Sequence, residues 1–232
     1  MVDKPVLVDV IFTAGKVFEN LRCDRQSTHA FITTGDLRGI TSRADLELLS
    51  DLSDATEPLI SFHNSGTPLT PEVIIAINKA MTRWGAIHPG QLRREHDIFG
   101  VPTRFGDHRP PAADEKTLRT IIDSVSALSP TDAAANLFVV LPKAQPFGDG
   151  NKRTALLAAN LLVLPQGQFL TVPFREGAPT VSDRFNELLA RAYNFGEVWP
   201  SRITWPRRAL FRFKDSKSET PPCMLSRSKV VS

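Results

Sequence analysis

Apolar residues recur at helical spacing along most of the chain between residues 42 and 206. Thr70 is followed by Pro71 and Glu72, an N-cap with a proline and an acid in the first turn, which predicts a helix start. Behind this start, apolar residues three and four positions apart predict one buried face. That face consists of Val73, Ile77, Ala80, Met81 and Trp84.

The same signals predict three more amphipathic helices, which begin at Asp114, at Ser129 and at Ser182. Their inward faces are Leu118, Ile121, Ile122, Val125 and Leu128; Ala134, Leu137, Phe138 and Leu141; and Phe185, Leu188, Leu189 and Ala192. Residues 154–164, TALLAANLLVL, are apolar nearly all round, which is typical of a helix at the centre of a bundle. The predicted fold class is mainly α.

Residues 94–111 interrupt this helical pattern with two glycines, three prolines and short extended pieces at 97–101 and 103–105. Such a segment predicts a hairpin or an ordered loop that crosses the helical body. Excursions of this kind often hold a ligand, although a plain connecting loop has the same composition. Both interpretations stay open at this point.

The net charge is unevenly distributed along the 232 residues. The whole chain carries a net charge of +3, but its last 26 residues carry seven basic and two acidic side chains, a net +5, which leaves the first 206 at −2. We therefore expect three parts: an N-terminal segment (1–41) packed on the core, a helical domain (42–206), and a basic tail (207–232), disordered after about residue 214. The body gives no sign of a nucleic-acid surface. Only the tail suggests a third, weaker interpretation, a DNA-associated regulator.

Two cysteines, Cys23 and Cys223, make neither a disulfide framework nor a zinc site. No apolar stretch approaches the roughly 18 residues that a membrane span needs. The N-terminus lacks the pattern of a secretory signal peptide. We therefore expect a cytoplasmic protein without a membrane partner.

The loop at residues 143–154, KAQPFGDGNKRT, carries the most chemical information. Gly148 and Gly150 permit close backbone approach, and the amides of residues 150–152 converge at the positive end of a helix dipole. Lys152 and Arg153 add two cations, so the loop has the features of a phosphate cradle. An ordinary helix N-terminus behind a glycine turn is the competing interpretation. Phe147 is expected to insert into the core and fix the shape of the loop.

The stretch from Gln145 to Arg153, QPFGDGNKR, resembles the signature of the Fic/Doc (Fido) family, His-x-Phe-x-Asp/Glu-Gly-Asn-(Gly/Lys)-Arg, at every marker except the first. Residues 94–111 and the helix after them are similar to the family's flap hairpin and the helix that follows it. The resemblance implies a Fic-fold helical bundle with a small β-hairpin flap beside the active loop. It also implies transfer of AMP from ATP to a Ser, Thr or Tyr hydroxyl of a target protein.

Carried over residue by residue, the resemblance implies that Asp149 binds Mg²⁺ on the ATP phosphates. Gly150, Asn151 and Lys152 would form the anion hole, Arg153 would contact phosphate oxygens, and Phe147 and Gly148 would complete the nucleotide-binding loop. The flap would clamp the target segment as an added strand, through Val101, Pro102, Thr103, Arg104 and Phe105. A separate antitoxin or regulator is a further partner that the resemblance allows.

Three departures from the family pattern change this picture. Lys152 stands where AMP-transferring members usually have Gly, as in Doc-like members that phosphorylate their target, so the orientation of the nucleotide stays open. Leu156 stands where they have a second Arg. Gln145 stands where the family has its general-base histidine, and an amide cannot accept a proton near neutral pH. We therefore expect an impaired transferase.

Three explanations of Gln145 stay open: a naturally degenerate pseudoenzyme, an engineered knockout of a toxic enzyme, or another base such as His96 or His108. The main alternative function is a non-enzymatic protein-binding or regulatory module on the same fold. Many Fic proteins also carry an inhibitory [Ser/Thr]-x-x-x-Glu-[Gly/Asn] helix. Residues 27–35 hold no Glu at that spacing, and with the Arg partner absent at Leu156 we expect no built-in glutamate inhibition.

Overall fold

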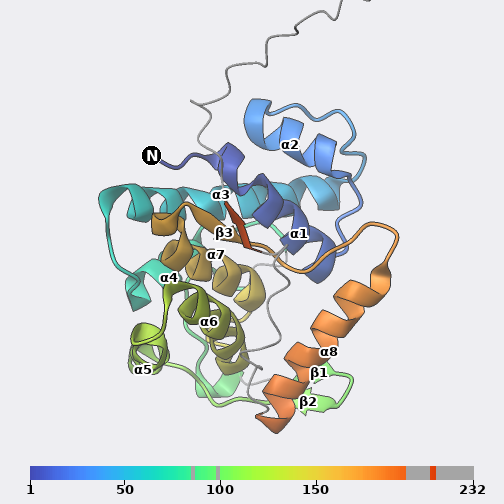
Figure 1. Cartoon of the computed structure of the whole chain (residues 1–232). Helices are drawn as coiled ribbons and strands as arrows, with labels where there is room; N and C mark the ends of the chain where they lie inside the picture. The colour runs from blue at the N-terminus through green and yellow to red at the C-terminus, as the bar shows by residue number, and fades with distance from the viewer. Residues whose placement is uncertain (85–86, 98–99, 197–209, 213–232) are drawn as a thin grey trace, which may run out of the picture.

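The computed structural model describes residues 1–84, 87–97, 100–196 and 210–212. Helix α7 (Asn151–Val163) lies at the centre of a helical bundle, and most of its side chains are buried. Its most extensive packing is against α6 (Pro130–Ala144), which lies beside it in Figure 1. The apolar sequence of α7 explains this position, because a helix without a polar face must bury its whole surface.

Four further helices surround this pair. Helices α1 (Val8–Phe18), α3 (Arg43–Ser65) and α4 (Pro71–Lys79) pack on α7, and α5 (Glu115–Ser126) packs on α6. Helix α2 (Arg25–Thr34) packs on α1, and the short 3₁₀ helix η1 (Lys4–Leu7) contacts α1, α2 and α3 (Figure 1). The mainly α fold class is confirmed.

Local capping explains why these helices begin where they do. The side chains of Thr70, Asp114 and Ser129 each accept a hydrogen bond from a backbone N–H of the first turn of their helix, as the sequence predicts. The last helix, α8 (Pro179–Phe195), starts three residues before the predicted Ser182. At the end of α5, Leu128 is 43% exposed, so its predicted inward position is wrong, because the helix ends at Ser126.

The predicted face of α4 extends too far, because the helix ends at Lys79 and Trp84 lies outside it. The buried carboxylate of Asp51, on α3, accepts hydrogen bonds from the backbone N–H groups of Thr82, Arg83 and Trp84 at 2.6–3.0 Å. These N–H groups therefore bond to a side chain about thirty residues away instead of continuing the helix. The result is a fixed loop that places Trp84 beside α1.

The predicted hairpin is present, although its strands are shifted from the expected extended pieces. After the 3₁₀ turn η2 (Glu95–Asp97), β1 (Val101–Thr103) pairs antiparallel with β2 (Gly106–His108), with Thr103 opposite Gly106. Helix α8 stands beside the bundle and contacts this hairpin at its C-terminal end (Figure 1). Asn194 of α8 donates to the Thr103 hydroxyl at 2.8 Å, which ties the hairpin to the helix.

A second small sheet packs on α7. After α7, the 3₁₀ turn η3 (Leu164–Gln166) leads into β3 (Gln168–Leu170), which pairs antiparallel with β4 (Leu210–Arg212). The predicted disorder after residue 214 lies outside the described residues. Among the helices of the described ranges, none combines the length and the apolar character that crossing a bilayer requires.

Candidate functional site

The loop between α6 and α7 begins at Gln145, which ends α6 in the left-handed conformation with φ 46°. Its side chain is buried and hydrogen-bonded at both ends: Nε2 donates to the Pro142 carbonyl at 2.6 Å, and Oε1 accepts from Asn151 Nδ2 at 3.0 Å. The Gln145 amide therefore holds the loop together and cannot act as a proton acceptor.

Asn151 holds the middle of the same loop. Its Oδ1 accepts from the Phe147 N–H and its Nδ2 donates to the Phe147 carbonyl, both at 2.9 Å. Phe147 is 1% exposed, which confirms that its ring inserts into the core. The loop is thus rigid, because every polar atom of the Asn151 side chain and one buried ring fix its path.

Gly150 turns the chain into α7 with φ 75°, a left-handed conformation that favours glycine. Beneath the turn, Asn78 Nδ2 donates to the Asp149 carbonyl and to the Thr154 hydroxyl, both at 3.1 Å. No side chain caps the N-terminus of α7. The first N–H groups of the helix therefore form an uncapped, partly positive end at the loop.

A cavity of about 340 Å³ lies over this helix end. It adjoins a second cavity of about 410 Å³ that extends between the hairpin and α8. Phe18, Val101, Pro102 and Lys152 line both cavities. Each volume falls in the range of small-molecule pockets, and their shared wall makes one elongated space.

Arg153 is the most buried charged group of the site, at 2% exposure. Its Nε lies 3.2 Å from Glu19 Oε1, and its Nη2 donates to Asp149. Neither its Nη1 nor its Nε makes a hydrogen bond, so the contact of Nε with Glu19 is an ion pair only. A buried guanidinium N–H without an acceptor is costly, so Nη1 marks a place where an oxygen-bearing ligand would be stabilised.

The sequence prediction missed Glu19, which follows α1 and lines the smaller cavity. Its Oε2 accepts from the Trp84 indole at 3.2 Å, so Trp84 and Arg153 hold the carboxylate between them. The expectation of no built-in glutamate inhibition rested on residues 27–35 and stays a prediction, but the structure brings a carboxylate from outside that segment, Glu19, to Arg153. A signal existed at residues 15–20, GKVFEN, which end in Glu-Asn at the inhibitory spacing but have Gly15 in place of Ser or Thr.

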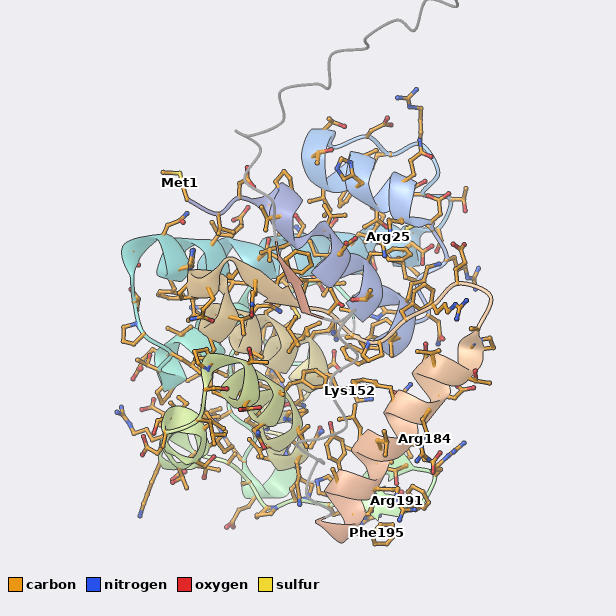
Figure 2. The ribbon with its side chains drawn as sticks, in the orientation of Figure 1. Met1, Arg25, Lys152, Arg184, Arg191 and Phe195 are labelled. Atoms are coloured by element: carbon orange, nitrogen blue, oxygen red, sulfur yellow. The ribbon has the colours of Figure 1, made fainter. Side chains whose placement is uncertain are left out.

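Lys152 lies between the two cavities, on the side of α7 that faces α8 (Figure 2). Its Nζ is 5.6 Å from the centre of the Phe18 ring, and burial lowers the pKa of its amine. The nearby Glu19 carboxylate opposes this shift. Binding of an anion beside Lys152 would favour its charged form.

The hairpin residues divide between the cavities. Val101 and Pro102 line both, Thr103 and Arg104 line only the larger, and Phe105 lies at the hairpin tip against Phe195, with ring centres 5.4 Å apart. Asn186 and Tyr193 on α8 also line the larger cavity, and the Asn186 Oδ1 and the Tyr193 hydroxyl are buried without a hydrogen-bond partner. The wall of the larger cavity therefore contains two polar atoms whose hydrogen bonds are unsatisfied.

The two histidines considered as alternative bases lie in or before the hairpin. The Nε2 of His108 is 2.6 Å from the Lys143 carbonyl, and its ring lies 5.5 Å from that of Tyr193. His96 belongs to the turn η2. His108 is not among the residues that line the cavity over α7.

Asp149 is the residue that could hold a metal ion. Its side chain is 39% exposed at the cavity, and within the described ranges no three His, Cys, Asp or Glu residues form a cluster fit for a metal. Mg²⁺ is commonly held by only one or two carboxylates together with substrate phosphates. The donor set therefore fits Mg²⁺ bound together with a polyphosphate.

Residues 68–163 match the sequence model of the Fic/DOC family. A Fic domain-containing signaling protein from Bacteroides thetaiotaomicron has a similar structure, with a TM-score of 0.60 and 18% identity over 80% of this chain and 70% of that chain. Fic-1 (residues 134–508) from C. elegans gives a TM-score of 0.61 and 18% identity over 83% of this chain and 59% of that chain. At this identity the likeness establishes the fold. A search of curated proteins gave no match.

Proposed function

We propose, on the premise that residues 68–163 belong to the Fic/DOC family, that this chain binds ATP with Mg²⁺ over the N-terminus of α7. Its activity would be that of a Fic-type transferase, which moves AMP or phosphate to a target protein. Transfer to a Ser, Thr or Tyr hydroxyl would be slow, because no proton acceptor stands at position 145.

The observation that carries this proposal is the buried, unpartnered Nη1 of Arg153 beside the uncapped end of α7. Both groups donate hydrogen bonds and carry positive charge, and both border the cavity of about 340 Å³. A phosphate satisfies donors of this kind from several directions at once. The fold and the charge thus favour the same ligand class.

Each residue of the loop has a defined task in this proposal. Arg153 and the amides of residues 150–152 would bind phosphate oxygens, and Lys152 would neutralise their charge. Asp149 would hold Mg²⁺, which shields the negative charge of the phosphates when it is bound. The nucleoside would extend into the larger cavity, where Asn186 and Tyr193 offer unpartnered polar atoms.

Gln145 limits the chemistry. A general base typically contributes about 10² to 10⁴ in rate when a proton must leave the attacking group. Both ends of the Gln145 amide are already hydrogen-bonded inside the loop, so it can neither accept that proton nor turn toward a substrate without breaking those bonds. Binding and positioning would remain, because they use the α7 end of the loop.

Thermal stabilisation by ATP with Mg²⁺ tests the binding step. At a ligand concentration 100 times the dissociation constant, binding stabilises the folded state by about 2.7 kcal/mol, which gives a clear rise in melting temperature. We expect the rise to disappear in Arg153→Ala. The matched control is Arg119→Ala, which removes an exposed arginine paired with Glu72 far from the loop. An equal rise in all three proteins would refute the site.

One observation favours a second candidate function, a non-enzymatic module that binds a protein partner through the hairpin. Two carboxylates, Glu19 and Asp149, contact Arg153, so the guanidinium that would bind phosphate is paired with groups of the protein itself. If these contacts are permanent, the phosphate cradle is vestigial. Absence of any thermal shift at millimolar ATP would favour this module.

A further inference from the structure

We propose that the acceptor in this site attacks through an oxygen that is already ionised, a phosphate monoester or a carboxylate, rather than through a hydroxyl. This inference rests on the proposed function, because it assumes bound nucleotide. It gives Gln145 a different interpretation. The site lacks a general base because its acceptor has no proton that must be removed.

The first reason is the state of the Gln145 side chain. Its Nε2 and Oε1 form hydrogen bonds to Pro142 and Asn151, and the backbone carbonyl of Gln145 accepts from Arg93 Nε at 2.9 Å. The residue is thus fixed in a structural role at three points. Such a residue contributes to the shape of the loop and takes no part in proton transfer.

The second reason is the set of titratable groups that line the cavity over α7, which are Glu19, Asp149, Lys152 and Arg153. The two carboxylates both contact the Arg153 guanidinium, which places their oxygens against the arginine. The Lys152 amine lies 5.6 Å from the centre of the Phe18 ring, at the wall that the two cavities share. The charged groups of this lining are thus paired with each other or placed to bind anions.

The third reason is a neighbouring cavity of about 280 Å³ that shares Gly148 with the cavity over α7. The titratable side chains that line it are His88, Arg93, Arg94 and Asp97, so the lining contains two arginines and a histidine but a single carboxylate. Arg93 connects this cavity to the loop, because its N–H donates to the Pro146 carbonyl at 2.8 Å and its side chain reaches Gln145. An anionic acceptor suits this lining better than a neutral one.

The proposed step balances without a base. The ionised acceptor oxygen forms a bond to a phosphorus atom of ATP, and the bond from that phosphorus to its bridging oxygen breaks. Pyrophosphate leaves if the α-phosphorus is attacked, and ADP leaves if the γ-phosphorus is attacked. No proton is released from the acceptor, so the work left to the protein is positioning and stabilisation of charge.

The test uses the full chain, Mg²⁺, and ATP labelled at the α-phosphate or, in parallel, at the γ-phosphate. Three matched acceptors are offered: the N-acetyl amides of phosphoserine, aspartate and serine. Each is given to the unaltered chain, to Gln145→His and to a blank without protein. The phosphoserine and aspartate arms separate the two sources of an ionised oxygen. Thermal stabilisation by ATP is measured on the same samples.

We expect the unaltered chain to label phosphoserine or aspartate above the blank and to leave serine unlabelled. Gln145→His should raise the ratio of serine labelling to ionised-acceptor labelling by about 10² to 10⁴, whatever the change in loop packing does to both. If ATP stabilises the chain but neither ionised acceptor is labelled, or if Gln145→His raises all acceptors equally, the inference is overturned and the proposed function survives. If ATP gives no stabilisation, both fail.

Discussion

The Glu19 carboxylate lies 3.2 Å from the Nε of Arg153, on the guanidinium that borders the cavity over α7. The two residues are 134 positions apart in the sequence, and the arginine is 2% exposed. A carboxylate and a phosphate are both anions that bind a guanidinium through two oxygens, so under the proposed function Glu19 would compete with a nucleotide phosphate for Arg153.

The first prediction concerns this competition. Glu19→Gln removes the charge but keeps the size of the side chain, so we expect ATP with Mg²⁺ to bind about tenfold more tightly, a change of about 1.4 kcal/mol. Isothermal titration calorimetry on the full chain measures this difference. The control is Glu57→Gln, which removes an exposed carboxylate paired with Lys4. An unchanged affinity in Glu19→Gln would show that the carboxylate does not compete.

The indole of Trp84 should influence the same equilibrium, because its Nε1 donates to Glu19 at 3.2 Å. Trp84→Phe keeps an aromatic ring but removes the donor. We expect ATP affinity to rise by a smaller factor than in Glu19→Gln, about two- to fivefold, because one hydrogen bond to a charged group contributes on the order of 1 kcal/mol. When Trp84→Phe is combined with Glu19→Gln, we expect the ATP affinity of Glu19→Gln alone. A further rise in affinity in the double variant would show that Trp84 does not act through Glu19.

Lys152 should take up a proton when nucleotide binds. Burial lowers the pKa of its amine, and a neighbouring phosphate would raise it again. At pH values between the lowered pKa and about 10.4, the free protein therefore holds fewer protons on Lys152 than the complex. Calorimetric titration in two buffers of different ionisation enthalpy measures this uptake. Lys152→Met should abolish it, and equal uptake in that variant would assign the proton to another group.

The same pKa shift makes a prediction for stability. The folded-state pKa of Lys152 is lowered, so the unfolded chain binds more protons than the folded chain between that pKa and about 10.4. The contribution of Lys152 to the free energy of unfolding therefore rises with pH across this window. Below this window the buried, charged amine lowers the free energy of unfolding of the unaltered chain, and Lys152→Met does not carry this cost. The two free energies of unfolding, measured by urea denaturation, should therefore approach each other as pH rises. A constant difference would contradict the shift.

Gly150 and Gly177 form a matched pair for testing the turn into α7. Both have positive φ, 75° and 71°, but a Cβ on Gly150 would lie 3.2 Å from Asn78 Nδ2 and from Met81 Cε, whereas a Cβ on Gly177 meets nothing within 4 Å. Alanine at either position costs about 1 kcal/mol of backbone strain. We expect Gly150→Ala to cost more than Gly177→Ala in urea denaturation and to weaken ATP binding, which Gly177→Ala should leave unchanged.

Asn151 provides the last prediction. Its side chain holds both backbone polar groups of Phe147 and the Gln145 amide, and it is buried. Asn151→Ala leaves those groups without partners, which should lower the free energy of unfolding by about 2 to 4 kcal/mol. Asn136→Ala is the control, because its exposed amide bonds only to the Asp132 carbonyl of its own helix. Equal losses in the two variants would show that the loop does not depend on Asn151.

The sequence by itself determined the features that depend on near neighbours. Thr70, Asp114 and Ser129 cap their helices because capping joins a side chain to a backbone N–H three residues away. The buried position of Phe147 and the central place of α7 follow from an aromatic ring in a polar loop and from a helix without a polar face. The loop motif also pointed to the Fic/DOC family, whose model matches residues 68–163, and to the fold that this chain shares with Fic domain structures.

Only the tertiary structure decided what the side chains of the site do. Asp51 ends α4 early and places Trp84 beside α1, Glu19 reaches Arg153 across 134 positions of sequence, and Asn151 engages the Gln145 amide. The first two contacts leave no periodic signal, because each joins polar atoms whose separation in sequence is set by the packing of whole helices. The third lies within one loop and depends on the path that this loop takes. Hydrophobic periodicity places the helices, whereas the pairing of buried charges depends on where the packed helices bring them together.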